Sequence, residues 1–260
     1  MCIRDSLPVD PDGRFPVAAG RPVYFTAPEV VDHHRAGWLA SGVRPGEVVV
    51  FRAEADAVAA ELARPGVSAG TARAFAADPV VGRALALLRN RERVRFDPLD
   101  GSELTYADPE GRVGTGAGGH EVFPRISPAV IGAVIHTGAD GEPEVLLAQN
   151  RRRPGYHSLI AGYVEAGETL EAAFAREVHE ETGRRVRDVR YWGSQPWPVS
   201  GSLMVGMVAH SDDREAVAAG DGEVFDIRWA TRAQLGELTL PAPGSIALRM
   251  LDAFAAGELA

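Results

Sequence analysis

The pattern of apolar and polar residues along the chain changes near residue 127. Before that point, short extended patches alternate with alanine-rich segments: VVVF at 48–51 predicts a buried strand, and 53–63 and 79–88 predict helices. After it, longer apolar runs are separated by turn residues. The pattern therefore predicts a small N-terminal α+β domain, residues 1–92, and a separate C-terminal domain, residues 127–260.

The C-terminal domain is expected to mix strands with helices. The runs AVIGAVI and EVLLAQ flank turn residues at 139–141, so together they predict a β-hairpin. Further strands are predicted near 189–192, 202–209 and 224–229, and helices near 170–182 and 245–256. Such a mixture predicts an α/β sandwich.

The segment between the domains, residues 93–126, contains the glycine-rich run GTGAGGHE, which favours tight loops. The first six residues, MCIRDS, differ in character from the rest of the N-terminal domain. We therefore leave residues 1–6 out of the fold prediction as a candidate non-native junction, in which case the natural N-terminus would be missing.

Composition narrows the functional classes. The formal net charge of −9 argues against a generally basic nucleic-acid-binding protein, although a local basic strip stays open. All 27 basic residues are arginine, which excludes a Schiff-base lysine and the lysine of a P-loop. Cys2 is the only cysteine, so the chain can form neither an internal disulfide nor a multi-thiolate zinc site. Without a long apolar run or a signal-peptide pattern, we expect a cytoplasmic protein with no membrane contact.

The stretch AREVHEETG, residues 175–183, places three glutamates at the end of a predicted helix. Thr169 is a suitable N-cap for this helix, and Gly183 is a suitable stop. At about 100° per residue, Glu180 and Glu181 lie within about 60° of Glu177 around the helix axis. The apolar residues of the earlier turns share this face: Leu170, Ala173 and Phe174. The helix therefore carries carboxylates where its buried apolar stripe should continue.

Clustered, partly buried carboxylates repel one another, which raises their pKa values unless cations neutralise them. Hard divalent ions with oxygen ligands suit such a cluster, and Mg²⁺ or Mn²⁺ is favoured where a substrate brings phosphates. His179 falls on the other side of the helix and is expected to be exposed. A surface helix with incidental acids remains the alternative on spacing alone.

A longer pattern surrounds these glutamates. From Gly162 the chain reads GYVEAGETLEAAFAREVHEETG: glycine, five residues, glutamate, seven residues, then Arg-Glu-Val-His-Glu-Glu-Thr-Gly. This resembles the Nudix box of the Nudix hydrolase superfamily, with Arg184 standing where a hydrophobic residue is usual. The resemblance implies an α/β/α sandwich that binds two to three Mg²⁺ or Mn²⁺ ions, which activate water against a diphosphate bond. It also implies catalytic roles within the box: Glu177, Glu180 and Glu181 as metal ligands, with Arg176 and Glu168 bracing the loop–helix–loop.

A second stretch, SQPWPVSGS at 194–202, resembles the SQPWPFPxS motif of bacterial NADH pyrophosphatases, a Nudix branch also associated with removing NAD caps from RNA. Val199 and Ser200 depart from that motif. Read without the resemblance, Trp197 suits a buried structural residue equally well. The resemblance implies a homodimer, in which Tyr163 is a candidate to come from the partner subunit. It further implies one more metal ligand and a set of substrate contacts: Glu223 for the metal; Gln195, Trp197, Ser202 and Ala247 for the pocket; Phe123 and Tyr163 around the adenine.

These pyrophosphatases usually carry a four-cysteine zinc ribbon between their domains. Asp97 and Asp100 occupy the spacing of its first cysteine pair, and Thr115 and Gly118 fit the second. Thr and Gly cannot replace thiolate ligands, so residues 93–126 are expected to form a degenerate, ribbon-like hairpin without zinc. A substitute hard-metal site at Asp97 and Asp100 is the less favoured alternative.

The two resemblances together imply hydrolysis of the diphosphate bond of NAD(H) to nicotinamide mononucleotide and AMP, with removal of the NAD cap from RNA 5′ ends as a related activity. One alternative keeps the chemistry but takes ADP-ribose or another nucleoside diphosphate derivative as substrate. Another alternative is a non-catalytic regulator that binds a nucleotide. Such a regulator would have little use for a full set of metal-binding glutamates, which favours an enzyme.

Overall fold

A computed structural model of the chain describes residues 5–23, 25–26, 41–44, 48–52, 55–75, 78–106, 112–138, 141–198 and 200–259. The chain divides into two compact units: Met1–Ile126 with Trp197–Gly201, and Ser127–Pro196 with Ser202–Ala260. A further division of the first unit after residue 92 stays a prediction. Among the described helices, none is both long and apolar enough to cross a membrane.

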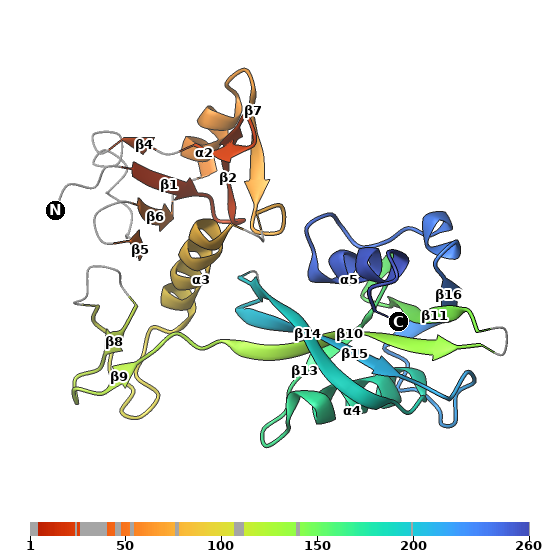
Figure 1. Ribbon diagram of the computed structural model, residues 1–260. Helices are drawn as coiled ribbons and strands as arrows, with labels where there is room; N and C mark the ends of the chain where they lie inside the picture. Colours follow the sequence, from red (N-terminus) through yellow and green to blue (C-terminus); the bar gives the residue numbers. More distant parts are fainter. Residues whose placement is uncertain are drawn as a thin grey trace. The chain divides into compact units, whose positions relative to one another are not determined.

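The first unit contains three small sheets, with strand orders β4-β1-β6-β5, β3-β2-β7 and β8-β9 (Figure 1). Its elements are β1 (Asp5–Val9), β2 (Arg14–Ala18), β3 (Arg21–Pro22), β4 (Phe25–Thr26), β5 (Ser41–Arg44), β6 (Val48–Arg52), α2 (Ala55–Leu62), β7 (Val67–Thr71), α3 (Pro79–Arg93), β8 (Gly114–Thr115) and β9 (Glu121–Val122). Its core joins apolar residues of β1 and β2 to one face of α3: Leu7, Val9, Phe15, Val17, Val81, Ala84, Leu85 and Leu88.

Several expectations for this unit are confirmed. The predicted strand is β6, the predicted helices are α2 and α3, and the hairpin expected in the glycine-rich segment is the antiparallel pair β8 and β9. Asp5 and Ser6 differ from expectation, because they form the first two positions of β1 and pair there with β4 and β6. Residues 1–4 lie outside the described residues.

One seven-stranded sheet forms the second unit. Five strands follow the order β12-β11-β10-β15-β14, while β13 pairs with β10 and β16 pairs with β11. The elements are β10 (Ser127–Thr137), β11 (Pro143–Asn150), β12 (Arg153–Ser158), β13 (Ile160–Tyr163), α4 (Leu170–Thr182), β14 (Arg187–Trp197), β15 (Ser202–His210), β16 (Val224–Thr231), η1 (Gln234–Glu237) and α5 (Ile246–Ala255). The predicted hairpin is the antiparallel pair β10 and β11, and residues 139–140 of its turn lie outside the described residues.

Both faces of β10 are buried, which explains its continuous apolar run. Ile131 and Ile135 belong to the core cluster that contains α5, whereas Val130 and Val134 belong to the cluster that contains Phe174 of α4. Successive side chains of a strand point to opposite faces of the sheet. The two helices therefore cover opposite faces (Figure 1), which is the predicted α/β/α sandwich.

Helix α4 begins and ends where its sequence predicts. The hydroxyl of Thr169 accepts a hydrogen bond from the N–H of Ala172 at 3.2 Å. Gly183 has a φ of 68°, in the left-handed region, and its N–H donates to the carbonyl of His179. The cap residues thus set both ends of the segment that carries the glutamates.

Arg184 is buried at the exit from α4, where the Nudix pattern has a hydrophobic residue. Its guanidinium donates to the carbonyls of Thr182 at 2.8 Å and Arg214 at 3.0 Å, and it lies 5.8 Å from the ring centre of Trp229. Burial lowers the pKa of Arg184. An arginine is accommodated here because it donates to the Thr182 carbonyl at the C-terminal end of the helix and to the Arg214 carbonyl in the loop after β15.

Candidate metal-binding and catalytic site

The three glutamates of the stretch AREVHEETG differ in burial. Glu181 is 6% exposed, Glu177 is partly buried, and Glu180 is exposed. His179 is exposed, as expected. The prediction that carboxylates continue the buried face of the helix therefore holds for Glu177 and Glu181, and Glu180 lies toward solvent.

Arg176 is the centre of an ion-pair network at this helix. Its Nε and Nη2 donate to the two carboxylate oxygens of Glu168 at 2.7 and 3.0 Å. Its Nη1 donates to Glu177 at 3.0 Å and to Glu180 at 2.9 Å. Its Nη2 also donates to the backbone carbonyl of Tyr163 at 2.9 Å. The expected contact between Arg176 and Glu168 is thus present, and its bidentate geometry joins α4 to the loop before it.

The network separates the pKa values of the carboxylates it contains. Hydrogen bonds from Arg176 lower the pKa of Glu168. Burial raises the pKa of Glu177 even though Arg176 acts in the opposite direction. A carboxylate with a lowered pKa suits a structural ion pair, whereas one with a raised pKa is poised to take up a cation or a proton.

Among the three glutamates, Glu181 is the carboxylate that a bound cation would stabilise most. Burial raises its pKa to about 8, and repulsion from Glu177, Asp221 and Glu223 acts in the same direction. In the part of the chain that the structure describes, no hydrogen bond or ion pair reaches this carboxylate. A divalent cation would supply the missing partner, so this oxygen-rich set fits Mg²⁺ or Mn²⁺. No three of these acidic side chains bring ligand oxygens within 4.8 Å of one another among the described residues, so binding would require them to draw together.

The loop between β15 and β16 brings a further carboxylate to the end of α4. The N–H of Asp221 donates to the carbonyl of Glu180 at 2.8 Å, and its Oδ1 accepts from the N–H of Glu223 at 2.8 Å. Gly220 packs on the helix end, since a Cβ there would stand 2.7 Å from the carbonyl oxygen of Glu181. Sequence reasoning missed Asp221. The only signal for it was its position two residues before Glu223.

Gly162, the first residue of the Nudix pattern, lies directly against Glu177. A Cβ on Gly162 would stand 1.9 Å from the carboxyl carbon of Glu177. Gly162 pairs with Val130 in the sheet, so its backbone has little freedom to move away. The glycine is therefore required to leave room for the carboxylate.

Gln195 connects β14 to the start of α5. Its Nε2 donates to the carbonyl of Gly244 at 2.8 Å, and its Oε1 accepts from the N–H of Ile246 at 2.7 Å. Gln195 is 3% exposed, and Ala247 is 4% exposed within the core under α5. Both residues thus shape the loop before α5, and their direct contact with a substrate stays a prediction.

The aromatic substrate candidates belong to different units. Tyr163 ends β13 with 54% of its surface exposed, and its hydroxyl lies 3.3 Å from the Oγ of Ser202. Phe123, which is 58% exposed, and Trp197, which is partly buried, belong to the first unit. Their part in a substrate pocket stays a prediction, and Val199 lies outside the described residues.

Comparison with known proteins finds a family match within the second unit. Residues 127–250 match the family model of the NUDIX domain, a range that contains the complete box and Glu223. The second unit is therefore similar to the NUDIX domain.

Its relatives include proteins named NAD-capped RNA hydrolase NudC. Those of Mycobacterium bovis and Mycobacterium tuberculosis are 41% identical over 194 residues, covering 69% of this chain and 61% of the relative. That of Salmonella paratyphi C is 42% identical over 131 residues, covering 50% of this chain and 48% of the relative. The matched region therefore spans less than two thirds of the length of these relatives.

Proposed function

We propose that the protein hydrolyses the diphosphate bond of NAD(H) to nicotinamide mononucleotide and AMP, with Mg²⁺ or Mn²⁺ as cofactor. The observation that carries this proposal is the buried carboxylate of Glu181, without a partner among the described residues, inside a complete Nudix box. Support for the dinucleotide comes from the SQPWP stretch at 194–198 and from the names of the relatives.

Glu177, Glu180, Glu181 and Glu223 are the residues proposed to hold two to three divalent ions. When bound, such ions neutralise charge on the diphosphate oxygens and make a nearby water more acidic. One glutamate of this set accepts a proton as the water attacks phosphorus. A new P–O bond forms, the bridging P–O bond breaks, and the two mononucleotides leave. Arg176 keeps Glu177 and Glu180 in position, and Glu168 orients Arg176.

Purified protein with Mn²⁺ should be offered NADH, NAD⁺ and ADP-ribose separately, with products resolved by chromatography. We expect kcat/KM for NADH to exceed that for ADP-ribose by about tenfold or more. A much higher rate on ADP-ribose would overturn the dinucleotide assignment. Binding of Mn²⁺ and nucleotide without cleavage of any substrate would favour a regulator instead.

The same site is proposed to remove the NAD cap from RNA. A cap requires few phosphate contacts, so the net charge of −9 does not oppose this activity. RNA carrying an NAD cap should release nicotinamide mononucleotide, while the same RNA with a 5′ triphosphate should be left intact. Cleavage of free NADH with no attack on capped RNA would restrict the enzyme to small molecules.

Replacing Gly162 by Ala is expected to reduce hydrolysis on the order of 100-fold with little change in thermal unfolding. The new Cβ would overlap the end of the Glu177 side chain, which can rotate away but then loses its position. Gly193→Ala is the matched control, because a Cβ there meets nothing within 4 Å. Wild-type activity in Gly162→Ala, or an equal loss in both variants, would contradict the role of Gly162.

Tyr163→Ala is expected to raise the KM for NADH about tenfold, because a base stacked on an aromatic ring loses that contact. Tyr163→Phe keeps the ring and loses only the hydroxyl that lies near Ser202, so its KM should stay close to wild type. Steady-state kinetics of both variants test the adenine contact. An unchanged KM in Tyr163→Ala would exclude it.

We further propose that the protein acts as a homodimer in the cytoplasm. The exposed rings of Tyr163 and Phe123 suit residues shared across a subunit contact, and a single cysteine suits a reducing compartment. Sedimentation equilibrium at assay concentration should give twice the chain mass. A fully active monomer would exclude the dimer, and cell fractionation would test the location.

A further inference from the structure

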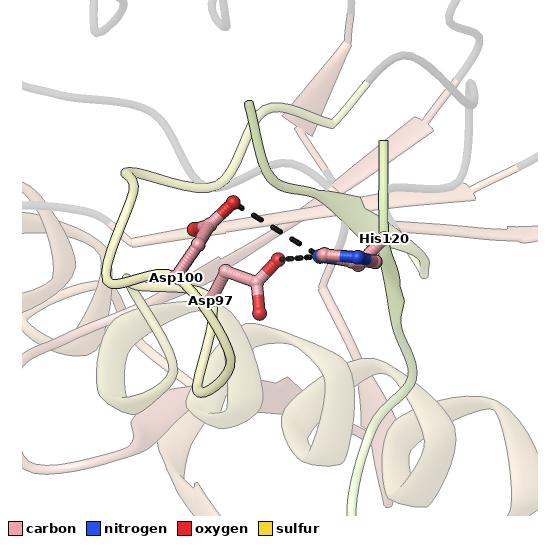
Figure 2. A group of neighbouring side chains, drawn as sticks. All are labelled: Asp97, Asp100 and His120. Atoms are coloured by element: carbon pink, nitrogen blue, oxygen red, sulfur yellow. Dashed lines mark ion pairs between the residues drawn. The ribbon is translucent and has the colours of Figure 1, made fainter. Parts of the chain in front are cut away.

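A group of potential metal ligands lies in the first unit, outside the Nudix domain. Asp97 and Asp100 belong to one turn, in which the N–H of Asp97 donates to the carbonyl of Ser102 at 2.8 Å. His120 belongs to a second turn, in which its carbonyl accepts from the N–H of Gly116 at 3.1 Å. Figure 2 shows the three side chains directed toward one another, with candidate ligand atoms all within 4.8 Å.

Asp97 carries a buried oxygen that has no hydrogen-bond donor. Its Oδ1 accepts from the N–H of Leu99 at 2.8 Å, but its Oδ2 accepts no hydrogen bond from any residue that the structure describes. The whole residue is 2% exposed, so water does not readily replace the donor. A buried carboxylate oxygen in this state is unfavourable unless a cation neutralises it. The Nδ1 of His120 lies 3.3 Å from this oxygen.

Asp100 presents a second carboxylate to the same imidazole. Its Oδ1 accepts from the N–H and the hydroxyl of Ser102 at 2.8 and 2.5 Å. Its Oδ2 accepts from the N–H of Gly118 at 3.1 Å and lies 4.0 Å from the Nδ1 of His120.

Gly116 allows the second turn to close over Asp97. A Cβ on Gly116 would stand 2.3 Å from the Oδ2 and 2.9 Å from the Cβ of Asp97, so the carboxylate or the turn would have to shift. The close approach of backbone to carboxylate therefore depends on glycine at this position. The result is a compact group in which two negative oxygens and one imidazole nitrogen share a small volume.

We propose that Asp97, Asp100 and His120 bind one Zn²⁺ ion that joins the two turns. Ligand atoms about 2.0 Å from a tetrahedral ion stand about 3.3 Å apart. The corresponding separations from Nδ1 are 3.3 and 4.0 Å. An imidazole beside two carboxylates favours zinc over magnesium or calcium, which take oxygen ligands. Three protein ligands leave one position for water.

The bound ion has a structural role and is independent of the hydrolysis proposed above. It neutralises the buried oxygen of Asp97 and links segments about twenty residues apart, so its binding energy stabilises the fold of this part of the chain. The inference revises the expectation of a segment without zinc, which rested on the missing thiolates. The third proposed ligand is His120. The spacing of the family's second cysteine pair had instead indicated Thr115 and Gly118, which cannot bind zinc through a side chain.

Zn²⁺ should be titrated by calorimetry into metal-free full-length protein, in excess Mg²⁺ to occupy the oxygen-only glutamate site. Wild type is expected to bind one equivalent of Zn²⁺, and His120→Ala should bind it at least about tenfold more weakly. Glu121→Gln is the matched control, because Glu121 is exposed and adjacent in sequence but outside the ligand group. It should retain wild-type affinity.

A second variant keeps the test decisive if His120→Ala does not fold. His120→Cys supplies a thiolate, which binds zinc but cannot act as a protonated partner of Asp97. It is expected to retain one Zn²⁺ and, with Co²⁺ as probe, to show a thiolate-to-cobalt absorption band. Absence of Zn²⁺ binding in wild type, equal affinity in a folded His120→Ala, or no metal in a folded His120→Cys would each overturn the proposal.

Discussion

Glu181→Gln is expected to lower the hydrolysis rate by about 10²- to 10⁴-fold and, in the metal-free protein at pH 8, to raise the free energy of unfolding. Both effects have one cause. Glu181 is 6% exposed and has no hydrogen-bond or ion-pair partner among the described residues, so its charge suits a bound cation and opposes folding without one. The amide of glutamine keeps the shape of the side chain and removes its charge.

The sign of the stability effect is set by the pKa of about 8 that burial imposes on Glu181. An ordinary glutamate in the unfolded chain has a pKa of about 4.5. Between these values the folded state holds a proton that the unfolded state has released, so the free energy of unfolding falls as the pH rises. The loss is complete above about pH 8 and amounts to a few kcal/mol, on the order given by the shift.

Urea unfolding in EDTA at pH 5 and pH 8 measures this effect. The stability gain of Glu181→Gln should be present at pH 8 and small at pH 5. Addition of Mn²⁺ should stabilise wild type more than the variant. His179→Gln, an exposed change on the same helix, should match wild type in activity and in pH dependence. A pH dependence in Glu181→Gln equal to that of wild type would refute the buried-charge interpretation.

Arg176→Ala is expected to reduce the free energy of unfolding by about 2–3 kcal/mol and to abolish hydrolysis. Arg176 donates to three carboxylates and one backbone carbonyl, so its removal leaves several partly buried acceptors without donors. Glu177 and Glu180 would then lose the contact that orients them. Urea unfolding and steady-state kinetics on NADH measure the two effects.

The variant Arg176→Lys tests whether Arg176 acts through its positive charge or through the geometry of its hydrogen bonds. An ammonium keeps the positive charge but cannot form the bidentate contact with Glu168 while also reaching Glu177 and Glu180. We expect it to recover part of the stability and little of the activity. Full activity in Arg176→Lys would show that charge alone suffices, and unchanged stability in Arg176→Ala would remove Arg176 from the structural network.

Local signals predicted α4 well. The cap at Thr169, the stop at Gly183 and the placement of Glu177 and Glu181 on the buried face depend on residue type and on the helical period. The apolar run in β10 also predicted a strand, because it is short and flanked by turns. The spacing of the glutamates alone was also compatible with a surface helix. Their roles as metal ligands came from the resemblance to the Nudix box.

Other elements gave weak local signals. Strands β12 and β13, RPGYHS and IAGY, were missed because they contain Gly, Pro and polar residues and owe their pairing to β11 and β10. The first two positions of β1 were missed because their composition was unlike the rest of the chain. Asp221 was missed because it lies in a polar loop, where no helical or strand periodicity distinguishes one acidic residue from another.

The sequence by itself determined the caps and period of α4, the order of acidic residues along the box and the absence of thiolate ligands, because these depend on residues close together in the chain. Only the tertiary structure decided which carboxylate is buried, that Arg176 reaches four acceptors, and that His120 faces Asp97 and Asp100. Those outcomes depend on contacts between residues distant in sequence, and periodicity carries no information about such contacts. AREVHEETG identified the acids, and the fold determined that Glu181 alone among them is both buried and without a partner among the described residues.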